Sequence, residues 1–228
     1  MRALALAALA LVSTSAQSRT VVVDVGHSLA APGSTGASGT TEFAYNRALA
    51  LEVAAEMRRL GWNVLVPNAD GRTRSLAARP AAASAAHADL FLSIHHDSVQ
   101  TWQMPDRGSF SGFSTWASGA HPAATASTRC ADSIGRAMAR GGMRPNLAHG
   151  MRVQGEGRDL QDARTGRYRR DDLAVLRLSK TPAVLVEAGV IVNPSEEAWL
   201  ARPDARAGIA RVIAAGANAC ITRTGETR

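Results

Sequence analysis

The expected fold depends on one stretch, Leu90-Phe91-Leu92-Ser93-Ile94-His95-His96-Asp97. Its apolar beginning is typical of a strand buried on both faces of a parallel sheet, and we predict that strand over Asp89–His95. The stretch ends in two histidines and an aspartate, which places groups that can bind a metal at the mouth of the sheet. Because successive side chains of a strand point to opposite faces, we expect His95, and not His96, to be a ligand.

Strands and helices alternate on both sides of this stretch. Before it we predict a strand, a helix, a second strand and a helix interrupted by Pro80: Thr20–Val25, Glu42–Leu60, Asn63–Val66 and Leu76–His87. After it we predict a loop leading into an edge strand over Thr101–Ser118, a helix over Pro122–Arg140 and a charged surface loop over Gly155–Arg170. A short strand or turn over Leu173–Leu178 and a buried strand over Ala183–Val186 should follow. The last two elements should be helices over Asn193–Leu200 and Pro203–Ala219. This order predicts an α/β fold with a largely parallel sheet and helices on both faces.

The length of 228 residues suits a single domain with a full hydrophobic core. Residues 1–18 have the features of a secretory signal peptide, namely Arg2, the apolar run Ala3–Val12 and small residues over Ser13–Ala16. That run is shorter than the roughly 20 apolar residues that span a bilayer, and no other stretch is long enough. We therefore predict an exported protein without a membrane span, whose mature domain comprises residues 19–228.

Charge and cysteine content suggest a partner and a compartment. The net charge of +7 comes almost entirely from arginine, since Lys180 is the only lysine. A basic protein favours an anionic partner, and export favours a carboxylate-bearing cell-wall polymer over nucleic acid. Cys130 and Cys220 are too far apart in sequence to resemble a metal motif. In an oxidising compartment they form either one disulfide or two buried thiols, and both readings stay open.

Four residues carry groups suited to metal-dependent hydrolysis: His27, Glu42, His95 and Glu187. Two histidines and one carboxylate form a common catalytic zinc set, in which zinc lowers the pKa of a water molecule toward neutrality. A second carboxylate then takes the proton of that water and passes it to the leaving nitrogen, a role that suits Glu187. Each residue taken singly also has a structural explanation, because a strand-end histidine is often a hydrogen-bonded rim residue and a glutamate at a helix start complements the helix dipole.

Several motifs in order resemble the zinc-dependent N-acetylmuramoyl-L-alanine amidases of the amidase-3 type, which are cell-wall hydrolases: Asp24-Val25-Gly26-His27, Glu42, Ser93-Ile94-His95 and Pro182-Ala183-Val184-Leu185-Val186-Glu187-Ala188-Gly189. The resemblance extends from about Val21 to Ala217. It implies a single α/β domain with a mostly parallel sheet of about six strands. It also implies one zinc ion held by His27, Glu42 and His95, with Glu187 as the catalytic carboxylate.

The reaction implied by the resemblance is hydrolysis, by a zinc-activated water, of the amide between the lactyl group of N-acetylmuramic acid and the L-alanine of the peptidoglycan stem peptide. The chain departs from the family pattern at Val25, at Phe43 and at His96-Asp97. We interpret His87, His121 and His149 as structural or surface residues, of which His149 precedes the charged loop. Some members of the family carry an inserted helix that plugs the zinc site, and the loop Gly155–Arg170 is too short and too rich in arginine to be such a helix. Its residues Arg158, Arg164 and Arg167 are candidates to hold the carboxylates of stem peptides.

Two other functions remain open. A secreted zinc peptidase acting on free peptides would use a similar ligand set, and a non-catalytic wall-binding protein would need neither zinc nor a general base. The presence of Glu187 together with all three ligands argues against the non-catalytic alternative. We expect a monomer that binds peptidoglycan and no nucleic acid, and the sequence leaves open whether an activator protein takes part. The absence of a wall-anchoring signal favours the periplasm over secretion into the medium.

Overall fold

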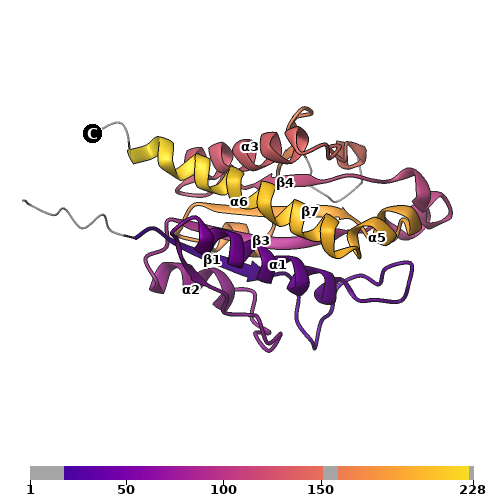
Figure 1. Ribbon diagram of the computed structural model, residues 1–228, viewed down its shortest axis with the longest axis horizontal. Helices are drawn as coiled ribbons and strands as arrows, with labels where there is room; N and C mark the ends of the chain where they lie inside the picture. Colours follow the sequence, from indigo (N-terminus) through magenta and orange to yellow (C-terminus); the bar gives the residue numbers. More distant parts are fainter. Residues whose placement is uncertain (1–17, 151–158, 226–228) are drawn as a thin grey trace, which may run out of the picture.

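The computed structural model describes residues 18–150 and 159–225, so nearly all of the predicted signal peptide lies outside the described residues. Within them the chain forms a seven-stranded sheet in the order β2-β1-β3-β7-β4-β6-β5 (Figure 1). Four adjacent strands run parallel: β2 (Asn63–Leu65), β1 (Thr20–Val25), β3 (Leu90–Asp97) and β7 (Ala183–Val190). This parallel half confirms the prediction made from the alternation of strands and helices.

The other half of the sheet is mixed. Strand β4 (Ser114–Ala117) pairs antiparallel with β7 and parallel with β6 (Arg167–Arg169). Strand β5 (Asp159–Asp162) pairs antiparallel with β6 and forms the edge. The predicted edge strand near Ser118 is therefore an interior strand, and the sheet has seven strands, in line with the expectation of about six.

The described part of the charged segment, residues 159–170, contains β5 and β6. Our prediction of a surface loop is therefore wrong for these residues. The side chains of Asp159–Asp162 are exposed or half-buried, as an edge strand allows. In β6 only Tyr168 is fully buried, and the adjacent Arg167 forms an ion pair with Asp132 at 2.7 Å. Charge in this segment reflects its place at the sheet edge, and residues 151–158 lie outside the described part.

Helices cover both faces of the sheet. One face carries α1 (Glu42–Arg59), α3 (Ala124–Arg140) and α6 (Pro203–Gly225), which lie side by side in front of the strands in Figure 1. The short helices α2 (Ala78–Ala85) and α4 (Ala174–Arg177) pack on the opposite face. None of the described helices combines the length and the apolar character that a bilayer span requires.

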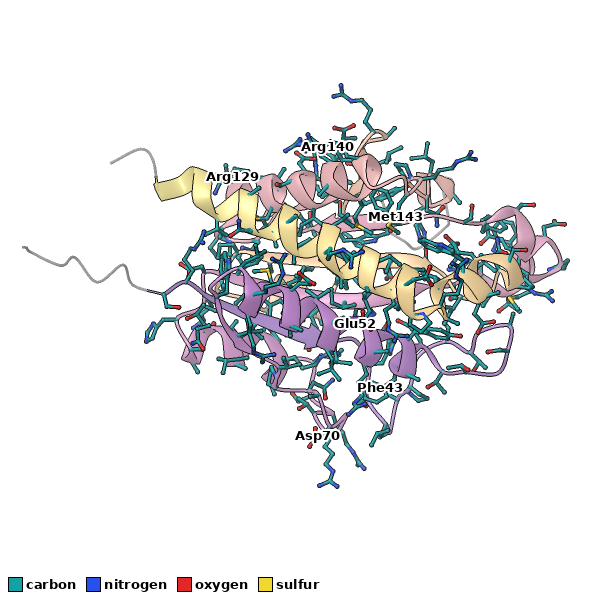
Figure 2. The ribbon with its side chains drawn as sticks, in the orientation of Figure 1. Phe43, Glu52, Asp70, Arg129, Arg140 and Met143 are labelled. Carbon is teal, nitrogen blue, oxygen red and sulfur yellow. A yellow bond between two sulfur atoms is a disulfide. The ribbon has the colours of Figure 1, made fainter. Side chains whose placement is uncertain are left out.

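Alternating side chains of the strands build the two cores. On β1, Val21 and Val23 pack toward α1, whereas Val22 packs toward Ala83 of α2 and Leu176 of α4. Burial on both faces explains why these strands read as unbroken apolar runs. Helices α1 and α6 are also joined at their surface by Arg206 and Glu52, whose Nε and Oε1 atoms lie 2.5 Å apart; Figure 2 labels Glu52 on α1.

Several predicted boundaries need small corrections. Helix α2 starts at Ala78, and Pro80 lies in its first turn, where the N–H that proline lacks would have no helical partner. The segment predicted as a short strand or turn near Leu173 is helix α4. Helix α5 (Pro194–Leu200) begins as predicted, with Asn193 Oδ1 accepting hydrogen bonds from two backbone N–H groups.

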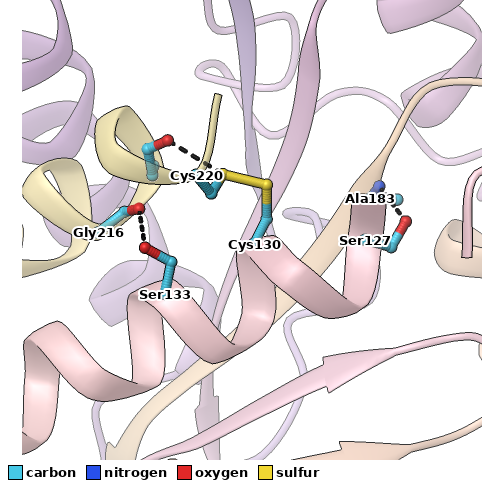
Figure 3. The surroundings of a disulfide bond; sticks show 7 residues. Ser127, Cys130, Ser133, Ala183, Gly216 and Cys220 are labelled. Carbon is cyan, nitrogen blue, oxygen red and sulfur yellow. Dashed lines mark hydrogen bonds between the residues drawn. A yellow bond between two sulfur atoms is a disulfide. The ribbon is translucent and has the colours of Figure 1, made fainter. Parts of the chain in front are cut away.

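Cys130 of α3 and Cys220 of α6 form a disulfide, which decides between the two alternatives left open by the sequence (Figure 3). Close packing surrounds it, since a Cβ on Gly216 would lie 2.6 Å from Cα of Ile134. Ser133 Oγ donates to the carbonyl oxygen of Gly216 at 2.8 Å, also shown in Figure 3. The bond therefore joins two helices of the same layer, 90 residues apart in sequence.

Candidate metal centre and active site

His27 lies just after β1 in a left-handed backbone conformation, with φ of 66°. The buried side-chain amide of Asn68 stabilises the turn that carries His27. Asn68 Nδ2 donates to the carbonyl oxygens of Val25 and His27, both at 2.7 Å. Arg79 Nη2 donates to the same Val25 carbonyl at 2.6 Å. These contacts fix an otherwise unfavourable backbone conformation and hence the position of the imidazole.

Glu42 is the first residue of α1 and is buried under the loop that joins β1 to α1. The backbone N–H of Ser34 donates to its Oε2 at 3.1 Å. Gly33 in this loop has φ of +77°, and a Cβ there would lie 2.4 Å from Oε2 of Glu42 and 2.7 Å from Cδ2 of His27. Glycine is required at this position both by the backbone conformation and by the space that the two side chains occupy.

His95 lies on β3, next to the turn after β1. A Cβ on Gly26 would lie 2.6 Å from Cε1 and Nε2 of His95, so the glycine leaves room for the imidazole. Gly26 also donates its backbone N–H to the carbonyl oxygen of Ile94 at 2.9 Å, which continues the β1–β3 ladder up to the site. The Gly26-His27 motif thus supplies one side chain of the centre and the space for another.

The three side chains meet at the carboxyl ends of β1 and β3. His27 Nε2 lies 3.0 Å from Oε2 of Glu42, and His95 Nδ1 lies 3.0 Å from Oε1. One ligand atom from each residue falls within 4.8 Å of the others. Burial by itself would raise the pKa of Glu42, but hydrogen bonds and charge from His27 and His95 lower it well below its usual range. The carboxyl group is therefore ionised, as a metal ligand must be.

The donor set fits a zinc ion. Ligand atoms about 2.0 Å from a tetrahedral zinc lie roughly 3.3 Å from one another, close to the contacts made by Glu42. The ring nitrogens that face Glu42 are Nε2 of His27 and Nδ1 of His95, and these are the atoms that would bind the ion. Two imidazoles and an ionised carboxylate are also a ligand combination that catalytic zinc sites use.

A buried amide, that of Asn46, supports the candidate ligand Glu42. Asn46, one helical turn along α1, donates from Nδ2 to Oε1 of Glu42 at 3.2 Å and to the carbonyl oxygen of Gly26 at 3.3 Å. Its Oδ1 lies 2.8 Å from Nδ1 of His96. Burial lowers the pKa of His96 to about 4, so its imidazole is neutral. His96 therefore contacts Asn46 and is not one of the residues that would bind the ion. Asn46 was not identified from the sequence as a support for Glu42.

Glu187 lies in the middle of β7, beside the centre. It is the register partner of His95 on β3 and of Ser114 on β4. Register partners on adjacent strands, about 4.8 Å apart, direct their side chains to the same face of the sheet. The carboxylate of Glu187 thus projects from the same face as the imidazole of His95. The signal that found it was the strand-end Glu-Ala-Gly pattern, although β7 continues beyond it to Val190.

A cleft of about 170 Å³ opens next to His27 and His95 on the face covered by α2 and α4. Most of its other lining residues are aliphatic or small, and the polar ones include Thr73, Arg74 and Arg79. Arg79 is buried, and its Nε and Nη2 donate to the two carboxylate oxygens of Asp24, both at 2.8 Å. A substrate in this cleft would therefore contact His27 and His95 of the candidate metal centre.

The other histidines and arginines singled out in the sequence lie elsewhere. His121 is buried, with Nε2 2.6 Å from the carbonyl oxygen of Ser179. His149 contacts Asp97 through Nε2 and packs against the rings of Trp116 and Tyr168. Arg164 and Arg167 are paired with Asp162 and Asp132 and do not line the cleft, and Arg158 lies outside the described residues. For Arg164 and Arg167, the candidate role in binding stem peptides therefore finds no support.

Comparison with known proteins agrees with this geometry. The sequence model described as "N-acetylmuramoyl-L-alanine amidase" matches residues 21–219. A curated relative, the N-acetylmuramoyl-L-alanine amidase AmiC of Neisseria meningitidis serogroup B, is 26% identical in an alignment of 212 positions that covers 86% of this chain and 51% of that protein. The chain thus spans about half the length of the curated relative that it matches.

Solved structures show the same fold. The N-acetylmuramoyl-L-alanine amidase from Clostridium difficile 630 has a TM-score of 0.73 at 21% identity, over 92% of this chain and 99% of that one. The amidase Ami1 from Mycobacterium smegmatis has a TM-score of 0.74 at 23% identity, over 90% and 97%. The catalytic domain of CwlV from Bacillus (Paenibacillus) polymyxa var. colistinus has a TM-score of 0.68 at 25% identity, over 92% and 99%. The chain belongs to the N-acetylmuramoyl-L-alanine amidase family.

Proposed function

We propose that this protein is a zinc-dependent amidase that hydrolyses the bond between the lactyl group of N-acetylmuramic acid and the L-alanine of the peptidoglycan stem peptide. The observation that carries the proposal is the group of His27, Glu42 and His95 beside a cleft that the two histidines line, in a chain of this family. Zinc bound there would act as a Lewis acid toward water and toward the scissile carbonyl.

The protein side chains have separate roles in this proposal. His27, Glu42 and His95 would hold the ion, and Asn46 keeps the Glu42 carboxylate in its orientation. Glu187 takes the proton of the attacking water and delivers it to the leaving nitrogen, so that the lactyl group ends as a carboxylate and the peptide ends with a free alanine amine. Its place inside β7, paired on both sides, limits its movement during these transfers.

The same proposal covers the processing and location of the chain. Residues 1–18 are a signal peptide and residues 19–228 form the catalytic domain, which acts as a monomer in the periplasm on peptidoglycan. The disulfide between Cys130 and Cys220 supports export, because disulfides persist in oxidising compartments and are rare in the cytosol.

Incubating the mature protein with purified sacculi, with and without a chelator, tests the proposal. We expect stem peptides with free N-terminal alanine, and no release once the metal is removed. Cleavage only within peptides would instead identify a zinc peptidase, and binding without products would identify a non-catalytic wall-binding protein. A Glu187→Gln variant should bind zinc with wild-type stoichiometry and lose the activity; an active variant would contradict the role of Glu187.

A further inference from the structure

Two guanidinium groups line the cleft, and they differ in availability. Arg79 is buried and bonded to both oxygens of Asp24 and to the Val25 carbonyl. Arg74 is exposed, and no carboxylate of the described residues forms an ion pair with it. The nearest acid in the sequence, Asp70, lies 3.9 Å from Arg72 and at the outer edge of the molecule in Figure 2. Arg74 is therefore the cation in the cleft that can bind an anionic ligand.

The backbone next to Arg74 is tied to the metal centre. The N–H of Thr73 donates to Oδ1 of Asn68 at 3.1 Å, and Nδ2 of the same side chain holds the carbonyl of His27 at 2.7 Å. A second link joins the two loops, because Leu29 donates its N–H to the carbonyl oxygen of Gly71 at 2.8 Å. One buried amide thus sets the position of a ligand and of the residue that precedes Arg74.

The remaining wall of the cleft is largely aliphatic. Leu76, Leu173 and Val175 line it, and Leu76 is 52% exposed although it is a large apolar residue. An aliphatic wall with one cation fits a ligand that carries a carboxylate among apolar groups. In a stem peptide, the carboxylate nearest the scissile amide is the free α-carboxylate of the second residue, γ-linked D-glutamate. It lies about two residues of extended chain, roughly 7 Å, from that amide.

We propose, on the basis of the proposed amidase function, that Arg74 binds this α-carboxylate and makes the protein selective for stem peptides in which it is free. A guanidinium binds a carboxylate through two parallel hydrogen bonds and cannot form them with a carboxamide. The selectivity is therefore against peptides whose second residue is D-isoglutamine. A charge-assisted contact of this kind corresponds to about tenfold in binding or in kcat/KM.

The test uses two muramyl tripeptides that differ only in the α-carboxylate or α-carboxamide of the second residue. The zinc-loaded mature protein should hydrolyse the carboxylate form about tenfold more efficiently. Arg74→Gln should bring the ratio of the two kcat/KM values close to one, and Arg74→Lys should keep part of the preference. Arg72→Gln is the matched control, because Arg72 is an exposed cation of the same loop that does not line the cleft; it should leave the ratio unchanged.

Binding of both tripeptides to the Glu187→Gln protein, measured by calorimetry, provides a second readout. There, Arg74→Gln should weaken binding of the carboxylate form about tenfold and remove the difference between the two ligands. A preference that survives Arg74→Gln, or one that Arg72→Gln removes equally, overturns the assignment of Arg74. Failure of the wild-type protein to hydrolyse either tripeptide overturns the proposed amidase function, and the binding comparison then decides the role of Arg74 alone.

Discussion

Asn46 and His96 form a buried pair in which Oδ1 of the amide lies 2.8 Å from Nδ1 of the imidazole. The other end of the same amide donates to Oε1 of Glu42. His96, next to the candidate ligand His95 in sequence, thus contacts Asn46 of α1, which supports the candidate ligand Glu42 at the start of the same helix. This relationship explains why a histidine is found at position 96 without a place in the metal centre.

Replacing Asn46 with Ala should weaken zinc binding 10- to 100-fold, the usual cost of losing a hydrogen bond behind a metal ligand. It should also destabilise the metal-free protein by about 1–3 kcal/mol, because His96 is left buried without this partner. Competition with a chromophoric chelator and urea unfolding would measure the two effects. Asn63→Ala is the control, since Asn63 is exposed and its side-chain Nδ2 donates to Thr20 Oγ1, far from the candidate metal centre. Unchanged zinc affinity in Asn46→Ala would contradict the supporting role.

Two loop glycines allow steric and backbone effects at the centre to be separated. Gly33 and Gly39 both have positive φ, 77° and 87°, but only at Gly33 would a Cβ meet the ligands, while at Gly39 nothing lies within 4 Å. Each Gly→Ala change should cost about 1–2 kcal/mol of stability from backbone strain. Gly33→Ala should in addition abolish or severely weaken zinc binding, as measured by metal content after dialysis. Equal zinc content in the two variants would show that the Gly33 contact is not limiting.

The disulfide should stabilise the fold without affecting the metal centre. Closing a loop of 90 residues corresponds to about 4–5 kcal/mol in the chain-entropy description. Near Cys220, Asn218 Oδ1 accepts from Trp62 Nε1, which places this end of α6 at the start of β2 and away from the strand ends that carry the ligands. A Cys130→Ser/Cys220→Ser variant should therefore unfold at lower urea concentration and keep one zinc per chain. Loss of zinc from the folded variant would contradict this separation.

The parts of this fold that could be predicted from sequence are those in which local pattern and tertiary environment agree. Thr20–Val25 forms a strand with the predicted bounds because consecutive valines pack on both faces of the sheet. Motifs at the ends of such strands predicted His27 and His95 as ligands, and the fold brings these two residues together with Glu42. Asn46 and Asn68 could not be recognised, because a polar residue on a helix or loop is ordinarily exposed and only the folded chain shows what it bonds. Arg167–Arg169 reads as loop because Tyr168 is its single apolar residue.

Asp171 gives the protein a stability that should depend on pH in the acidic range. Its Oδ2 accepts from Arg169 Nη2 at 2.6 Å, and its Oδ1 accepts from Ser118 Oγ at 3.0 Å and from the backbone N–H of Gly119 at 2.7 Å. The hydrogen bond with Arg169, followed by those from Ser118 and Gly119, lowers the pKa of Asp171 from 3.8 to about 2. The native carboxylate therefore binds its proton more weakly than the unfolded one does.

The resulting stabilisation is present above pH 4 and is lost as the pH falls toward 2. Because the side chain is 36% exposed, solvent screening should keep the effect below about 1 kcal/mol. Urea unfolding of the metal-free protein should show Asp171→Asn to be less stable than wild type at pH 6 and equal to it near pH 2. Asp204→Asn is the control, because Asp204 and its partner Arg202 are 68% and 60% exposed, and it should change stability little at either pH. A difference between wild type and Asp171→Asn that persists near pH 2 would mean that packing, and not the ionised carboxylate, accounts for the effect.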